Sequence, residues 1–168
     1  MKEIKLTRGC VAFVDNKDYL ELNKYNWFAQ LGGRTPYAVR ASTRLEKKAG
    51  FGNAIRMHRQ ILGLGYKDKS CVDHINHNGL DNRRKNIRIC TYSQNGMNRL
   101  KQQKTATSKF KGTTLTKSGK WQSSIVINKK PFYLGRYDTE LEAANAYAIK
   151  AKELFGNFNY MQHCKDEQ

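Results

Sequence analysis

The chain lacks the patterns by which zinc knuckles, disulfide frameworks and membrane proteins are recognised. Its cysteines, Cys10, Cys71, Cys90 and Cys164, lie far apart and form no C-x-x-C pair, so we expect neither a zinc knuckle nor a disulfide framework. No run approaches the roughly 18 apolar residues of a membrane span, and the first residues lack the apolar core of a signal peptide. Scattered thiols suit a reducing compartment, so we expect a cytoplasmic chain without a membrane partner.

Acidic residues are also scarce. The 168 residues hold 31 Lys and Arg against 14 Asp and Glu, a formal net charge of +17. A polyanion that binds such a surface releases condensed counterions, so nucleic acid is the first partner to consider. Charge alone does not separate sequence-directed DNA binding from generic RNA coating or a merely soluble basic surface. The length allows one ordinary domain or two small modules.

Short elements are predicted before the most informative segment. Apolar runs predict strands over 10–14 and 37–42, and apolar spacing predicts helices over 15–23 and 57–64. Between them, T-R-L-E-K-K-A-G-F-G-N at 43–53 carries charge and two glycines, which predicts a hairpin or an exposed loop. We expect a strand-rich scaffold.

The segment 71–95 reads C-V-D-H-I-N-H-N-G-L-D-N-R-R-K-N-I-R-I-C-T-Y-S-Q-N. It predicts an extended run that ends at Asp73 and His74, a wide polar turn, a return strand over 87–90 and a helix from about Thr91. This order would bring Asp73, His74 and Asn95 together. Phosphodiester hydrolysis needs a base and a cation, and these residues could supply the base and hard oxygen ligands for Mg²⁺ or Mn²⁺. The alternative is that the Asp and Asn residues are turn and cap residues only.

The succession D-H, D-N-R-R-K-N-I-R and Q-N resembles the HNH endonuclease motif in its variant with Asn as third member. The resemblance implies a ββα-metal core at about 70–100, with His74 as general base and with Asp73 and Asn95 as metal ligands. It also implies that Asn86 braces the loop. Related enzymes are phage nicking nucleases, so we expect a homing-type enzyme encoded by a phage or mobile element in a bacterial host.

A basic cluster and three further histidines lie outside this set. The cluster is predicted to hold the phosphates that flank the cut, although a solvated face is the alternative; it consists of Arg83, Arg84, Lys85 and Arg88. His58 is expected to be packed inside the fold. His77 is expected to be an idle loop residue, and His163 to have no role.

After a polar linker predicted at 99–108, the pattern changes to three short strands and one helix. Trp121, Ser123, Ile125 and Ile127 alternate with Gln122, Ser124 and Val126. Thr139 with Glu142 predicts a capping box, and Gly156 predicts the end of the helix. The predicted apolar stripe of this helix consists of Leu141, Ala144, Ala148, Ala151 and Phe155. One face of the small antiparallel sheet would then stay free.

F-K-G, K-W, Y-L-G-R-Y and the A-A-N-A-Y helix resemble the plant ethylene-response-factor (APETALA-type) DNA-binding domain over about 108–160. The resemblance implies a DNA-facing set of Lys111, Thr114, Lys117, Trp121, Ser123, Lys130, Tyr133 and Arg136. Arg136 is the best candidate to read a guanine. For Trp121 and Tyr133, ordinary sheet packing is the alternative. Lys111, Ser124 and Tyr133 replace residues that are usually Arg, Glu and Trp, so the plant target sequence is not carried over.

We therefore predict an α+β chain with a nuclease module over 1–106 and an APETALA-type domain over 107–168. It would cut double-stranded DNA with one Mg²⁺ or Mn²⁺ ion and leave 5′-phosphate and 3′-hydroxyl ends. One site per chain predicts nicking by a monomer, although a dimer stays open. The rival hypothesis is a DNA-binding regulator that has lost catalysis.

Overall fold

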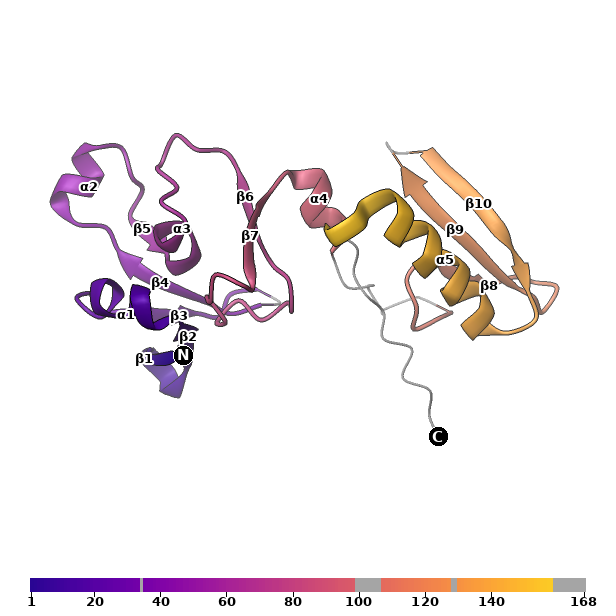
Figure 1. Cartoon of the computed structure of the whole chain (residues 1–168), viewed down its shortest axis with the longest axis horizontal. Helices are drawn as coiled ribbons and strands as arrows, with labels where there is room; N and C mark the ends of the chain where they lie inside the picture. The colour runs from indigo at the N-terminus through magenta and orange to yellow at the C-terminus, as the bar shows by residue number, and fades with distance from the viewer. Residues whose placement is uncertain (34, 99–106, 128–129, 159–168) are drawn as a thin grey trace. The chain divides into compact units, whose positions relative to one another are not determined.

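The computed structural model describes residues 1–33, 35–98, 107–127 and 130–158. It divides into two compact units, Met1–Asn95 and Gly96–Gln168, which are coloured indigo to magenta and orange to yellow in Figure 1. Helices alternate with small antiparallel sheets, so the predicted α+β class is confirmed. The domain boundary predicted after residue 106 falls at the end of segment 99–106, outside the described residues, and stays a prediction. The linker predicted in this segment and the absence of a role for His163 also stay predictions.

Two small sheets and short helices form the scaffold of the first unit. The first sheet pairs β1 (Lys2–Lys5) with β2 (Val11–Val14), and the second has the order β3 (Phe28–Gln30), β4 (Tyr37–Ala41), β5 (Ala54–Arg56). The helical segments are η1 (Thr7–Gly9), α1 (Asn16–Leu22), α2 (Arg44–Lys48) and α3 (Met57–Ile61). The strands predicted over 10–14 and 37–42 and the helices predicted over 15–23 and 57–64 are confirmed.

The hairpin or exposed loop predicted over 43–53 is confirmed in part: the segment is largely exposed and joins the antiparallel strands β4 and β5, but its residues 44–48 form α2, which was not predicted. Thr43 caps this helix: its hydroxyl accepts a hydrogen bond from the Glu46 backbone N–H at 3.2 Å, and the Glu46 carboxylate accepts one from the Thr43 N–H at 2.7 Å. The Glu46 carboxylate also accepts a hydrogen bond at 2.8 Å from Arg40, a residue of β4 that is only 3% exposed. Local capping and this ion pair therefore order a charged segment.

The core of the first unit lies between these small sheets and helices. Leu22, Trp27 and Met57 are at most 4% exposed, and Ile87, at the start of the later strand β7 (Ile87–Cys90), joins them. The Arg40 guanidinium lies 4.0 Å from the centroid of the Tyr25 ring, so the apolar core is closed by a stacked and ion-paired arginine. The Arg40 hydrogen bonds lower the pKa of Glu46 to about 2.

The informative segment folds in the predicted order. Strand β6 (Cys71–His74) pairs antiparallel with β7 (Ile87–Cys90), and α4 (Tyr92–Met97) follows directly. The register places Asp73 opposite Arg88 and His74 opposite Ile87. The strand–loop–strand–helix order is confirmed. The metal ion that the resemblance implies stays a prediction.

The second unit is a three-stranded antiparallel sheet with one long helix. The strands β8 (Thr113–Leu115), β9 (Trp121–Ile127) and β10 (Lys130–Tyr137) have β9 in the centre, and α5 (Glu140–Phe155) is followed by η2 (Gly156–Phe158). Thr139 and Glu142 form the predicted capping box. The buried residues of α5 are Ala143, Ala144, Tyr147 and Ala151, and Tyr147 and Ala151 form a core cluster with Ile125. Leu141 was predicted in this stripe but is 41% exposed, so that assignment is wrong.

Among the described residues, no helix combines the length and the apolar character that a membrane span needs.

Candidate active site

The loop between β6 and β7 is fixed to the scaffold by main-chain hydrogen bonds. The Phe13 N–H donates to the Leu80 carbonyl at 2.9 Å, and the Asn82 N–H donates to the Phe13 carbonyl at 2.8 Å. Gly79 lies so close to the neighbouring chain that a Cβ there would be 2.4 Å from the Pro36 carbonyl oxygen. The loop can therefore approach β4 only with glycine at this position.

Asn86 braces the loop from inside. Its side-chain Nδ2 donates to the Asp81 carbonyl at 2.7 Å, and its Oδ1 accepts from the Asn76 N–H at 3.0 Å. Asn76 in turn donates to the Asp81 carboxylate at 2.9 Å. The bracing contacts predicted for Asn86 are present, and their effect on catalysis stays a prediction.

His74 lies at the end of β6 and is 6% exposed. Its Nε2 is 3.4 Å from Oδ1 of Asn82, a fully buried residue whose Nδ2 donates to the Leu80 carbonyl at 3.1 Å. Because the carboxamide donates through Nδ2, Oδ1 is the acceptor, and this network assigns the proton of neutral His74 to Nε2. The other ring nitrogen, Nδ1, then carries the lone pair that a base needs.

The protonation of His74 is governed mainly by its burial. Desolvation lowers the pKa of His74, while the hydrogen bond to Asn82 and the charges of Asp73 and Asp81 act in the opposite direction. The ring is therefore neutral at physiological pH and able to accept a proton.

Two further rings pack around His74. The His58 ring centroid lies 5.0 Å from that of His74 at an interplanar angle of 78°, and the Tyr37 ring lies 5.6 Å from His58 and 5.8 Å from His74. His58 is 3% exposed, so its predicted packed position is confirmed. Burial and the nearby charges of His74, Arg56 and Arg59 lower the pKa of His58 to about 3. This arrangement surrounds the candidate base with neutral rings.

Asp73 precedes His74 on β6 and is 5% exposed. Arg88, its partner across the two strands, donates to Asp73 Oδ2 from Nη2 at 2.6 Å and from Nε at 2.9 Å. The carboxylate is thus held at a fixed place beside the candidate base.

The two predicted metal ligands carry oxygen donors of the kind that suits a hard divalent cation. Asp73 offers carboxylate oxygen, and the half-buried Asn95, within α4, offers carboxamide oxygen. Within the described ranges, no group of three His, Cys, Asp or Glu side chains could hold a metal ion. Mg²⁺ is commonly bound through one or two protein carboxylates plus substrate phosphates and water, so two protein donors fit it in chemistry.

The predicted phosphate-contacting arginines have carboxylate partners inside the fold. Arg83 pairs with Asp81 at 2.6 Å, and Arg84 pairs with Asp18 of α1 at 2.8 Å. Arg84 also donates to the Ile61 carbonyl at 3.0 Å. These contacts tie the loop to α1 and α3. Contact of these residues and of Arg88 with DNA stays a prediction.

Lys85 differs from its arginine neighbours. It is exposed, and no carboxylate of the described residues pairs with it. His77, in the same loop, is half-buried with a left-handed φ of 63°, and burial lowers the pKa of its ring. The prediction that His77 is idle stays a prediction.

Sequence reasoning missed two residues of the site. Asn82 lies within the quoted D-N-R-R-K-N run, one residue after Asp81, so a signal for it was present. Tyr37 is distant in sequence from both histidines, and no local pattern links it to them. Only the fold brings the Tyr37 ring to His58 and His74.

The sheet of the second unit has one face covered by α5 and a second face, called the free face, that no described helix covers. Directly opposite residues share a face, and the register pairs Thr114 with Gln122, Gln122 with Arg136 and Ser124 with Tyr133. These residues alternate with Ser123 and Ile125, which are 0% and 1% exposed. Thr114, Tyr133 and Arg136 therefore lie on the free face.

The predicted position of Ser123 on the free face is wrong, because its side chain is fully buried beneath α5. Trp121 is in phase with Ser123 along β9 and shares its side of the sheet, where it is half-buried. Lys111 donates to the Met97 carbonyl at 2.7 Å. Lys117 and Lys130 are exposed. DNA contact by the remaining residues of the set stays a prediction.

Comparison with known proteins gives one long match and one short one. A protein of Acanthamoeba polyphaga mimivirus described as an uncharacterized HNH endonuclease is 32% identical over 155 residues, which cover 90% of this chain and 74% of that protein. APETALA2-like protein 2 of Oryza sativa, subspecies indica and japonica, is 52% identical over 42 residues, 24% of this chain and 10% of the rice protein. No protein-family model and no solved structure matches. The short rice match lends weak support to a DNA-binding domain.

Proposed function

Because this chain belongs to the HNH endonuclease family, we propose that it hydrolyses phosphodiester bonds of double-stranded DNA with one divalent ion, Mg²⁺ or Mn²⁺. One observation carries the proposal: the buried His74 is oriented by Asn82 at the same strand end as the Asp73 carboxylate. A neutral imidazole beside a hard oxygen donor is the pairing that hydrolysis of a phosphodiester needs.

The protein's own residues account for the proton transfer. His74 accepts a proton at Nδ1 from a water molecule, whose oxygen forms the new bond to phosphorus. The bond from phosphorus to the 3′ oxygen breaks, and that oxygen takes up a proton from solvent. The products are a 5′-phosphate and a 3′-hydroxyl. Asn82 holds Nε2 of the ring throughout, and Asn86 maintains the loop that carries Asn82.

Asp73 and Asn95 would hold the divalent ion. When bound, this ion supplies positive charge that stabilises the negative charge developing on the phosphate oxygens and on the leaving oxygen. Arg88 keeps the Asp73 carboxylate in place beside His74.

The second unit would hold the enzyme on its target. The free face of its sheet presents Thr114, Tyr133 and Arg136, and a strand ribbon of this size can enter the major groove of DNA. Homing-type action would follow from recognition of a chosen site by this face. A single active site in a monomer would nick one strand in each event.

Nicking of supercoiled plasmid tests the proposal directly. Wild-type protein with Mg²⁺ should produce open circles, whereas the same protein with EDTA should not. His74→Ala should lower the nicking rate by about 10² to 10⁴-fold, because it removes the general base. Its DNA binding, measured by gel shift, should stay within about twofold of wild type. Cutting by His74→Ala at the wild-type rate would refute the assignment of the base.

The rival function is a regulator that binds DNA without cutting it. It would be favoured if wild-type protein shifted DNA in a gel but left both the plasmid and a genomic-library substrate intact with Mg²⁺ and with Mn²⁺. The library matters because an enzyme with a long recognition site would leave most plasmids uncut.

A further inference from the structure

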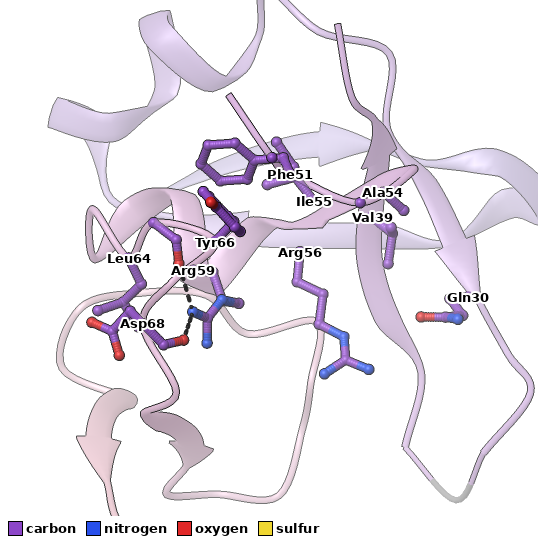
Figure 2. A pocket seen from close by; sticks show the side chains of 13 residues that line it. Gln30, Val39, Phe51, Ala54, Ile55, Arg56, Arg59, Leu64, Tyr66 and Asp68 are labelled. Carbon is purple, nitrogen blue, oxygen red and sulfur yellow. Dashed lines mark hydrogen bonds between the residues drawn. The ribbon is translucent and has the colours of Figure 1, made fainter. Parts of the chain in front are cut away.

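The first unit contains an open pocket of about 440 Å³ that the proposed chemistry does not use. It lies between β4, β5, the turn after α2 and the loop after α3, as Figure 2 shows. The residues that line it include Gln30, Phe51, Gly52, Arg56, Arg59 and Tyr66. Sites for small organic ligands have volumes of about 300 to 1,000 Å³.

One end of the pocket is aromatic. The rings of Phe51 and Tyr66 lie 6.0 Å apart at an interplanar angle of 56°. Tyr66 packs onto Gly50, where a Cβ would lie 2.4 Å from the ring and where φ is +96°. The ring is still 49% exposed. The pocket therefore has an apolar wall that is fixed in place and accessible to a planar group.

The two arginines that line the pocket have different partners. Arg59 donates to the carbonyl oxygens of Ser70, Gly65 and Asp68 at 2.9, 3.1 and 2.8 Å, so it shapes the loop after α3. Arg56 is exposed, and no carboxylate in the described part of the chain pairs with it. In Figure 2 the Arg56 side chain extends away from the Phe51 and Tyr66 rings, with its guanidinium at the far end of the chain. Arg56 can therefore take up an external anion.

Arg56 is also coupled to the candidate active site. Its guanidinium lies 5.2 Å from the centroid of the Tyr37 ring, and that ring contacts His74 at 5.8 Å. A single aromatic side chain thus separates the exposed cation from the candidate base. An anion held by Arg56 would therefore lie about one aromatic side chain away from the imidazole that activates the attacking water.

We propose that this pocket holds one nucleotide of the cut DNA strand, turned out of the duplex, with its phosphate on Arg56 and its base against Phe51 and Tyr66. The proposal rests on the proposed function for the identity of the strand. The net charge of +17 and the unpaired guanidinium select an anion, and the aromatic wall suits a base, because bases stack on aromatic side chains irrespective of sequence. Asp68 borders the pocket beside Arg59 and repels a phosphate from that end.

Two pairs of variants test the pocket. Arg56→Gln removes the cation, and its control, Arg44→Gln, removes an exposed arginine of α2 that lies outside the lining. Gly52→Trp fills the pocket, and Gly32→Trp is its control. An added Cβ at Gly52 or Gly32 meets no atom within 4 Å, and neither residue has a left-handed φ. Thermal melting confirms that each variant folds.

Binding of full-length protein to duplex DNA is measured over a range of salt concentrations. Arg56→Gln should lower affinity and reduce the slope of log affinity against log salt by about 0.9, which is the loss of one phosphate contact. Gly52→Trp should lower affinity about fivefold or more without changing the slope. By NMR, a 2′-deoxynucleoside 5′-monophosphate should shift the amide signals of Gly52 and Tyr66 more than inorganic phosphate does, and Arg56→Gln should abolish the shift.

Several outcomes would overturn the proposal. If Arg56→Gln binds DNA like Arg44→Gln, or Gly52→Trp like Gly32→Trp, the pocket holds no nucleotide. Equal shifts from inorganic phosphate and the nucleotide would show an anion site without base recognition. If wild type nicks DNA in a His74-dependent way while all four variants bind like wild type, only the pocket is refuted. If wild type never nicks but Arg56→Gln and Gly52→Trp bind more weakly than their controls, the nuclease proposal fails and the pocket stands.

Discussion

The first unit buries its polar side chains in a hydrogen-bonded loop, whereas the second unit displays them on the free face of a sheet. Asp81, Asn82 and Asn86 are at most 6% exposed, and each has hydrogen-bond partners in the loop. In the second unit, Arg136 is exposed, while the fully buried Ser123 hydroxyl has no hydrogen-bond partner among the described residues.

This difference matches two kinds of task. A buried and satisfied network holds one geometry, which proton transfer requires. An exposed polar face can adapt to a ligand surface and needs little internal support. The first unit thus holds these polar groups in one fixed geometry, and the second presents them to solvent.

Lowering the pH should destabilise the first unit much more than the second. The pKa of His58 in the folded state is about 3, against 6.5 for the free side chain. Below pH 6.5 the unfolded chain takes up a proton that the folded unit refuses, so folding stability is lost as pH falls toward 3. The expected loss is about 1.4 kcal/mol for each pH unit. The described residues of the second unit contain no histidine.

Urea unfolding at pH 7 and pH 5 measures this difference. Trp27, which is 4% exposed, reports the first unit in a Trp121→Phe variant, and amide signals of α5 report the second. His58→Phe keeps a ring in place and should flatten the pH dependence of the first unit. Equal acid sensitivity of the two units would contradict the buried, neutral state assigned to His58.

Asn82→Ala should impair catalysis without weakening DNA binding. The Asn82 carboxamide is the group that orients His74, and removal of such a supporting partner lowers activity by about 10- to 100-fold in comparable sites. Rates of plasmid nicking and gel-shift affinities measure the two effects separately.

Asn78→Ala is the matched control for this change. Asn78 lies in the same loop and accepts a hydrogen bond from the Leu80 N–H at 3.0 Å, but its side chain is exposed. Asn82→Asp retains the acceptor toward His74 and should recover part of the rate. If the Asn78 and Asn82 variants lose activity equally, Asn82 supports the loop as a whole and does not orient the base.

Arg84→Ala should lower the free energy of unfolding by about 1 to 3 kcal/mol. The change removes an ion pair with Asp18 and a hydrogen bond to the Ile61 carbonyl, which join the loop to two helices. Lys85→Ala removes the same charge from the adjacent position, where no such contacts exist among the described residues, and should leave the melting temperature unchanged. If Lys85→Ala and Arg84→Ala weaken DNA binding equally at unchanged stability, both are phosphate contacts.

The sequence predicted the position of the site better than its supporting contacts. Asp73 and His74 end one strand as predicted, because strand runs and turn residues are local patterns, whereas the bracing contacts of Asn86 were expected only from the resemblance to the HNH motif. The partner of Arg84 is Asp18, 66 residues away. Such pairing depends on how α1 packs against the loop, and no local pattern contains it.

The helix α2, within the segment 43–53, was missed for a different reason. Charge and two glycines outweighed the T-R-L-E capping box in that prediction, although Thr43 and Glu46 form it in the structure. A helix as short as α2 has little periodicity to reveal it, and tertiary contacts such as the Arg40–Glu46 ion pair supply stability that propensity does not.

Alternation along β9 showed which residues share a face but not which face α5 covers. Serines occur in both phases, at Ser123 and Ser124, so polarity alone does not decide between them. The deciding contacts are those of Ile125 with Tyr147 and Ala151. Only packing of the helix assigns the two faces.

Ser123→Ala should have the smallest effect of these changes. The hydroxyl is fully buried and has no hydrogen-bond partner in the described part of the chain, so its removal should leave the free energy of unfolding unchanged or raise it by about 1 kcal/mol. DNA affinity should not change.

Ser124→Ala, one residue along on the free face, should leave stability within about 0.5 kcal/mol of wild type but lower DNA affinity. Chemical denaturation and gel shifts measure both. If Ser123→Ala weakened DNA binding at unchanged stability, Ser123 would contact DNA after all, and the two faces of the sheet would have to exchange roles.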